Sequence, residues 1–232
     1  LWYTRGGWLG RLEFRLRQYR YRDHVASALT RAQRIIASSH ALAGAVSAWF
    51  DVEASRVCVN RWGLETAPYD QALSESPAPE DRPIHLLSPR GLRAVYHGEA
   101  VTKALVTVLE DHPNAQATVL TGGLPVPQSA PQHARLRYET RFLAVDEMAQ
   151  RWASATHLVS VPPYEAVSSV LYEAAYSGVV PIVYPNDATL EVFGSGASEP
   201  PPLTRSSDRT RHTPIIGEGD DHPRAVFVKP PL

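Results

Sequence analysis

The chain has 232 residues, enough for one large domain or two modest ones, and its 44% hydrophobic and 20% charged residues are typical of a soluble globular protein. A net charge of −1 at pH 7 speaks against a nucleic-acid-binding protein as a whole, and no apolar run reaches the roughly 18 residues of a transmembrane helix. The single cysteine, Cys58, excludes an internal disulfide and fits a reducing, cytoplasmic compartment. We expect it to be a small hydrophobic residue inside a strand.

The first 34 residues are aromatic and basic. The apolar residues that recur there at helical spacing are Leu9, Leu12, Leu16 and Tyr19. This spacing predicts a helix over about 9–32. One interpretation is a basic surface that binds anionic lipid at the inner face of the membrane, or an anionic acceptor. The other is the solvated face of a helix that docks on a sheet.

An incomplete α/β domain is predicted for residues 1–66. After the first helix, short strands are expected at 34–38 and 56–60, with a helix between them at 40–50. The segment 67–83 is rich in Ser, Pro, Glu and Asp and is predicted to be a linker.

Residues 84–193 alternate between apolar strands and amphipathic helices. The strands are expected near 84–87, 117–120, 158–161 and 179–184, with a further one near Leu136 or Phe142. The helices are expected near 99–109, 146–153, 166–176 and 188–192. This order predicts a Rossmann-like parallel sheet with helices on both faces, preceded by the partial second α/β domain. The proline-rich segment 194–232 is predicted to be a disordered tail.

One strand–loop–helix unit in this region indicates a specific chemistry. Ligands of parallel α/β sheets bind at the carboxyl ends of strands, and free N–H groups at a helix start favour a phosphate. Ser168 and Ser169 lie in the predicted first turn and add hydroxyl groups. Glu173 follows one turn later, where a carboxylate can accept hydrogen bonds from a sugar diol. Glu165 lies at the strand tip, although a glutamate there is also favoured by the helix dipole alone.

This unit resembles the E-x7-E region of the group 1, family 4-like glycosyltransferases with the GT-B fold. The residues that match its pattern in order are Pro162, Glu165, Glu173, Ala174, Gly178, Pro181 and Ile182. Ala166 stands where the family usually has glycine. Upstream, 87–90 resembles the first strand of the family's donor domain with its arginine, and 119–123 resembles a strand that ends in a Gly-x-Gly turn. The resemblance covers about residues 34–193.

The resemblance implies a role for each matched residue. Glu165 would contact the transferred sugar as the catalytic residue, and Glu173 would bind the ribose hydroxyls of the nucleotide. The residues implied to hold the diphosphate are Arg90, Ser168 and Ser169, with Arg93 and Gly122 as further donor-binding candidates. The family usually has a lysine about five residues after the arginine, where this chain has Val95 and Tyr96. No metal and no cofactor is expected, because the nucleotide diphosphate sugar is itself the donor substrate.

The leading hypothesis is a glycosyltransferase fragment that transfers a sugar, with retention, to a glycan, a lipid-linked or a small-molecule acceptor. We expect the first half of the acceptor-side domain to lie before residue 1. The alternative is a truncated nucleotide-binding or interaction domain without turnover, which the missing lysine favours. A third hypothesis is a related GT-B epimerase or phosphorylase. A dinucleotide-binding oxidoreductase is disfavoured, because no Gly-x-Gly-x-x-Gly follows a first strand.

Overall fold

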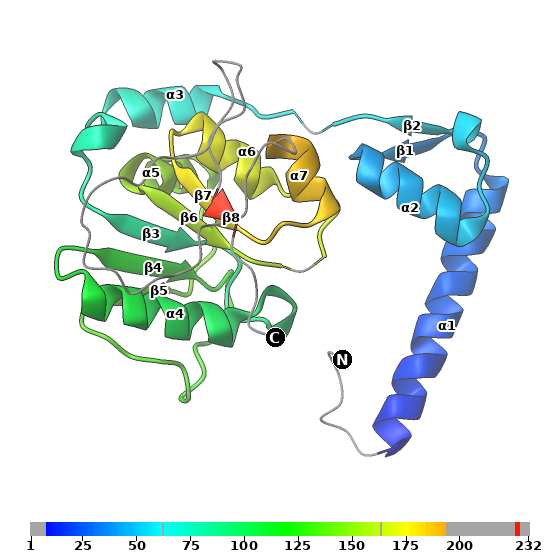
Figure 1. Cartoon of the computed structure of the whole chain (residues 1–232), viewed down its shortest axis with the longest axis horizontal. Helices are drawn as coiled ribbons and strands as arrows, with labels where there is room; N and C mark the ends of the chain where they lie inside the picture. The colour runs from blue at the N-terminus through cyan, green and yellow to red at the C-terminus, as the bar shows by residue number, and fades with distance from the viewer. Residues whose placement is uncertain (1–7, 62, 163, 194–225, 228–232) are drawn as a thin grey trace. The chain divides into compact units, whose positions relative to one another are not determined.

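The structure is a computed structural model that describes residues 8–61, 63–162, 164–193 and 226–227 (Figure 1). The chain divides into two compact units, residues 1–62 and 63–232, and each is described by itself. The elements of the first unit are α1 (Trp8–Arg31), β1 (Ile35–Ala37), α2 (His40–Phe50), the 3-10 turn η1 (Ala54–Arg56) and β2 (Val57–Val59). These elements agree with the helix, strand, helix and strand that the sequence predicts there.

The first unit is a small parallel two-stranded sheet with a crossing helix. β1 pairs with β2 in the register Ile36 to Cys58. α2 begins where the Ser39 hydroxyl accepts a hydrogen bond from the Leu42 amide at 3.0 Å, an N-cap that satisfies a free helix donor. Ile36 and Cys58 are both exposed, while Ile35 on the alternate side is buried. Cys58 lies inside a strand, as expected, and its position in β2 places it on the exposed side of the pair.

The second unit holds the larger sheet. Its strands are β3 (His85–Ser88), β4 (Gln116–Leu120), β5 (Leu136–Glu139), β6 (His157–Ser160), β7 (Val180–Val183) and β8 (Val226–Phe227). Its helices are α3 (Ala67–Ser74), α4 (Gly98–Asp111), α5 (Val145–Ser154), α6 (Ser169–Tyr176) and α7 (Asp187–Phe193), with the 3-10 turns η2 (Pro79–Asp81) and η3 (Ala94–Tyr96). The strand order is β5-β4-β3-β6-β7-β8, and every pair is parallel.

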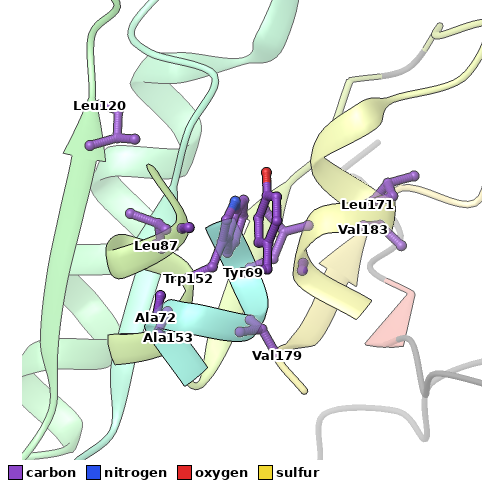
Figure 2. Packing of buried hydrophobic residues seen from close by; sticks show 13 residues of the cluster. Tyr69, Ala72, Leu87, Leu120, Trp152, Ala153, Leu171, Val179 and Val183 are labelled. Atoms are coloured by element: carbon purple, nitrogen blue, oxygen red, sulfur yellow. The ribbon is translucent and has the colours of Figure 1, made fainter. Parts of the chain in front are cut away.

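Helices cover both faces of this sheet, as predicted for a Rossmann-like arrangement. Leu86 and Leu87 are neighbours on β3 and point to opposite faces, and both are buried. Leu86 belongs to the core beneath α4, and Leu87 belongs to the core shared by α3, α5 and α6 (Figure 1). Trp152 and Tyr69 lie close together inside the second core (Figure 2). A strand buried on both faces needs a continuous apolar run, which explains why β3 could be recognised in the sequence.

The segment 67–83 differs from the expected linker. It forms α3 and η2, and Tyr69 and Ala72 of α3 are buried in the core. Arg82 fastens its end, because the guanidinium donates to the backbone carbonyls of Pro77, Ala155 and Ser177 at 3.1–3.2 Å. The segment is therefore part of the folded unit although its composition is mostly polar, because two core residues one helical turn apart and one buried arginine anchor it. The second unit accordingly begins at residue 63.

Most of the predicted disordered tail, 194–232, lies outside the described residues. Val226 and Phe227 are described, and they form β8, which pairs with Ile182 and Val183 of β7. This pair extends the sheet by one short strand and departs from the expectation for the tail.

Candidate functional site

The predicted site residues lie where strands of the large sheet end. β3 ends at Ser88 and is followed by Arg90, and β6 ends at Ser160 and is followed by the loop that carries Glu165 and Ser168. β3 and β6 are neighbours in the sheet although about seventy residues separate them in the chain. The carboxyl ends of parallel strands share one edge, so the two segments meet there.

Arg90, Glu165 and Ser168 form one polar cluster at this edge. The Arg90 guanidinium makes an ion pair with Glu165 and donates a hydrogen bond to the Ser168 hydroxyl through the same terminal nitrogen. The side chains of Arg90 and Glu165 are 19% and 17% exposed, so the pair is largely removed from water. The structure therefore brings together three of the residues that the sequence predicts for the site.

Tyr96 completes the cluster from η3. The Arg90 guanidinium carbon lies 5.2 Å from the centre of the Tyr96 ring, a distance at which a cation is attracted to an aromatic face. Tyr96 lies in the region where the glycosyltransferase family usually has its lysine. From the sequence, position 96 stood out only because it lacks the family's lysine. In the structure, the Tyr96 ring packs against the Arg90 guanidinium.

The turn after β3 depends on a glycine. Gly91 has a φ of +68°, and a Cβ atom there would lie 3.3 Å from the Leu120 carbonyl oxygen. Glycine is the residue that adopts this conformation at little cost. The turn brings the segment of Arg90 against the end of β4.

Burial raises the pKa of the Glu165 carboxyl above its ordinary value. The charge of Arg90 and the hydrogen bonds from Ser168 and Arg90 act in the opposite direction, because they favour the carboxylate. Glu165 therefore releases its proton less readily than an exposed glutamate, despite its cationic partner.

Two buried polar atoms at this edge lack a hydrogen-bond partner within the described part of the chain. They are Arg90 Nε and the hydroxyl of Ser160, which ends the neighbouring strand β6. A buried polar group without a partner costs about 1–3 kcal/mol, so native proteins rarely leave one without a reason. Both atoms therefore have hydrogen-bonding capacity that a ligand can use.

The helix start differs from the prediction. The first helical residue is Ser169, and Ser168 precedes it in an extended conformation, whereas the sequence placed the start near 166–167. Among the described residues, the Ser168 hydroxyl makes no cap hydrogen bond to α6, and it accepts from Arg90 instead. The free amides of the helix start therefore begin at Ser169, whose side chain is exposed.

Glu173 has partners that the sequence did not predict. Its Oε2 accepts a hydrogen bond of 2.8 Å from the indole Nε1 of the fully buried Trp152. Burial raises the pKa of the Tyr69 hydroxyl, and the charge of Glu173 and a hydrogen bond to it raise this pKa further. The carboxylate is thus bound by residues of α3 and α5 and does not join the Arg90 cluster. Its role toward a ribose stays a prediction.

Replacing Glu173 with alanine is expected to destabilise the second unit. The change leaves two buried donors, on Trp152 and Tyr69, without their acceptor, at a cost of about 1–3 kcal/mol each. Urea unfolding followed by circular dichroism measures the loss. Glu110→Ala removes an exposed glutamate and serves as the control, with a change near zero. Equal losses in the two variants would contradict the structural role of Glu173.

The two remaining candidates lie on turns. Arg93 is exposed beside η3, and its side chain makes no hydrogen bond or ion pair to any described residue. Gly122 follows β4 in a turn with a φ of +60°. Their roles in donor binding, and the contact of the 9–32 helix with a membrane, stay predictions.

Residues 8–61, 63–162, 164–193 and 226–227 contain no group of three or more His, Cys, Asp or Glu side chains that could hold a metal ion. Within the same residues, no helix combines the length and the apolar character required to cross a bilayer.

No family model and no curated protein matches the sequence. By structure, the chain is similar to the pneumococcal O-GlcNAc transferase GtfA in complex with UDP and GlcNAc, with a TM-score of 0.61 and 14% identity. The match covers 82% of this chain and 38% of GtfA. The fold is that of GT-B glycosyltransferases. The fold predicted from the sequence is thereby confirmed.

Two further structures support the GT-B fold. Anabaena HepE in complex with UDP-glucose matches with a TM-score of 0.55 and 15% identity over 72% of this chain and 48% of HepE. A UDP-forming trehalose-phosphate synthase from Burkholderia xenovorans matches with a TM-score of 0.58 and 9% identity over 74% of this chain and 50% of the synthase. The chain thus spans half or less of the length of these three proteins.

Proposed function

We propose that this GT-B chain binds a nucleotide diphosphate sugar and contributes the donor site of a retaining glycosyl transfer. One observation carries the proposal: the half-buried Arg90, which follows β3, is held by Glu165 and Ser168, and its Nε has no hydrogen-bond partner among the described residues. Two of the similar proteins were solved with UDP or a UDP-sugar, and a third is named as UDP-forming, which supports a uridine nucleotide as the donor carrier.

Arg90 and the start of α6 fit the chemistry of such a donor. In glycosyl transfer, the bond between the sugar C1 and the diphosphate oxygen breaks, a bond from C1 to the acceptor oxygen forms, and the acceptor loses a proton. Negative charge increases on the leaving diphosphate. A guanidinium fixed by its neighbours and largely removed from water, together with the amides that begin at Ser169, stabilises that charge.

Glu165 is proposed to contact the transferred sugar. Its carboxylate holds the Arg90 terminal nitrogen, which leaves Arg90 Nε for a phosphate oxygen. A bound sugar places hydroxyl groups near Glu165, and the carboxylate can accept from them while it keeps Arg90 in position.

A nucleotide-binding domain without turnover is the second candidate. It is favoured by the presence of Val95 and Tyr96 where the family usually has a lysine, since one cation fewer faces the diphosphate. Both candidate functions include binding of the nucleotide sugar, and only the first includes transfer of the sugar.

Release of free sugar from UDP-glucose or UDP-GlcNAc separates the two candidates. A donor site with turnover is expected to hydrolyse the donor slowly without an acceptor. Glu165→Gln removes the charged acceptor, and since a hydrogen bond to a charged group contributes about 1.5–3 kcal/mol, release is expected to fall roughly 10- to 100-fold. Glu110→Gln, at an exposed helix position, serves as the control. Binding without release in the wild-type chain would favour the second candidate, and absence of binding would contradict both.

A further inference from the structure

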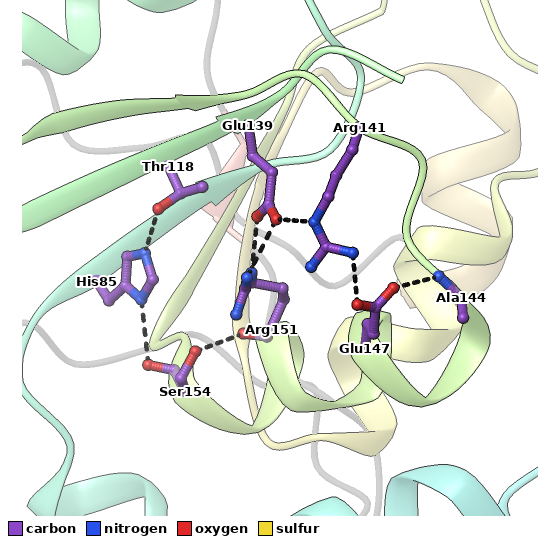
Figure 3. A network of polar contacts seen from close by, with 8 residues as sticks. All are labelled: His85, Thr118, Glu139, Arg141, Ala144, Glu147, Arg151 and Ser154. Carbon is purple, nitrogen blue, oxygen red and sulfur yellow. Dashed lines mark hydrogen bonds and ion pairs between the residues drawn. The ribbon is translucent and has the colours of Figure 1, made fainter. Parts of the chain in front are cut away.

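A polar cavity lies between α5 and the sheet. Its volume is about 300 Å³, and strands β3, β4 and β5 and the last turns of α5 line it. None of its lining residues belongs to the Arg90 cluster. Its lining includes His85, the first residue of β3, and Thr118, in the middle of β4 (Figure 3), whereas Arg90 follows the end of β3.

The wall of this cavity is polar where a parallel sheet is usually apolar. His85 and Glu139 are both buried, and both lie on the face of the sheet that α5 covers. Further along the same face, Leu87 and Leu120 belong to the apolar core. Burying polar groups costs free energy unless they are hydrogen-bonded, so both side chains require hydrogen-bond partners.

Glu139 is held as a carboxylate. Arg151 donates to both of its oxygens, at 2.8 and 3.2 Å, and Arg141 donates to it at 3.1 Å (Figure 3). The hydrogen bond from Arg151 is the largest influence that lowers the pKa of Glu139, and the charges of Arg151, Arg141 and Arg137 add to it.

His85 presents a neutral ring. Its Nδ1 lies 3.3 Å from the Ser154 carbonyl oxygen, and its Nε2 lies 2.9 Å from the Thr118 hydroxyl (Figure 3). A carbonyl only accepts, so Nδ1 carries the proton and the Thr118 hydroxyl donates to Nε2. Burial lowers the pKa of His85, followed by the weaker influences of the Ser154 hydrogen bond, which raises it, and of the Arg151 charge, which lowers it.

The cavity has a surplus of positive charge. Three arginines line it, Arg135, Arg137 and Arg151, against the single carboxylate of Glu139. Arg135 donates to the Leu109, His112 and Ala115 carbonyls at the end of α4, so its terminal nitrogens are in use. Arg137 is exposed, and its side chain makes no hydrogen bond or ion pair with any residue that the structure describes.

We propose that this cavity binds a small phosphomonoester, with its phosphate at Arg137 and Arg151 and its polar body against Thr118 and His85. Among the described residues, the guanidinium of Arg137 holds no partner, and it can bind a phosphate through two parallel hydrogen bonds. Arg151, whose Nε and one terminal nitrogen hold Glu139, adds positive charge beside it. A volume of about 300 Å³ lies at the lower end of the range of small-molecule sites and exceeds what a lone phosphate fills. The site is separate from the proposed donor site and does not depend on it.

Calorimetric titration of the full chain with glucose 6-phosphate and, separately, with inorganic phosphate tests the proposal. The ester is expected to bind in a saturable way and more tightly than inorganic phosphate. Arg137→Gln is expected to weaken ester binding about tenfold or more, and because Arg137 is exposed and unpartnered among the described residues, this variant should fold normally. Arg22→Gln removes an exposed arginine in the first unit and should bind like the wild type.

The donor edge gives the second control. Arg90→Gln should leave ester binding unchanged, because Arg90 does not line the cavity. The His85 ring NMR signals should shift during the titration, since the phosphate binds beside the ring. Three results would each overturn the proposal: no ester binding to the wild-type chain, equal affinity for inorganic phosphate and the ester, or loss of binding in Arg90→Gln with Arg137→Gln unaffected.

Discussion

Replacing Trp152 with alanine is expected to lower the free energy of unfolding of the second unit by about 3–5 kcal/mol. Trp152 is the largest of the fully buried side chains in the described residues, and it packs in the core that contains Tyr69 and Leu158 (Figure 2). Truncation opens a cavity there and removes the indole donor of Glu173. Urea unfolding followed by circular dichroism measures the loss without relying on tryptophan fluorescence.

Two further variants separate the parts of this effect. Trp152→Phe keeps most of the packing and removes only the donor to Glu173, so its loss should be about 1–3 kcal/mol. Trp49→Ala removes an aromatic side chain that is 70% exposed, and its effect should be near zero. A loss in Trp152→Ala as small as that of Trp49→Ala would show that the core is not packed as described.

The sequence predicted the elements of the large sheet because its strands are apolar on both faces. β3, β4, β6 and β7 each begin and end within two residues of their expected bounds. Strand order could not be read from the pattern, because nothing local in 157–160 identifies β3 as its neighbour. The meeting of Arg90 with Glu165 therefore needed either the structure or the family resemblance.

Sequence patterns did not reveal features that depend on individual tertiary contacts. Periodicity placed Glu173 on the ligand face of its helix and did not reveal that the buried Trp152 donates a hydrogen bond to it, while its role toward a ribose stays a prediction. The segment 67–83 was predicted as a linker from its average composition, while Tyr69 and Ala72 pack it into the core. The cavity around Arg137 was not predicted, because it depends on which residues of three strands lie side by side in the sheet.

Arg90→Ala is expected to weaken the binding of UDP-glucose about 10- to 100-fold, because a hydrogen bond between charged groups contributes about 1.5–3 kcal/mol. The variant also leaves Glu165 buried without its cationic partner. Arg90→Lys keeps the charge but lacks the planar fork, so its affinity should fall between those of the wild type and the alanine variant. Arg22→Ala, at an exposed position in the first unit, is the matched control. All affinities are measured by calorimetry at one fixed salt concentration, since salt weakens phosphate contacts.

The calorimetric titration of UDP-glucose into the wild-type chain and into Arg90→Ala tests the proposed donor site most directly. We predict saturable binding at one site per chain in the wild type and a large loss of affinity in the variant. The unfolding midpoint of each chain is measured alongside to show that both are folded. No binding to the folded wild-type chain, or equal affinity in the folded variant, would contradict a donor site at the end of β3.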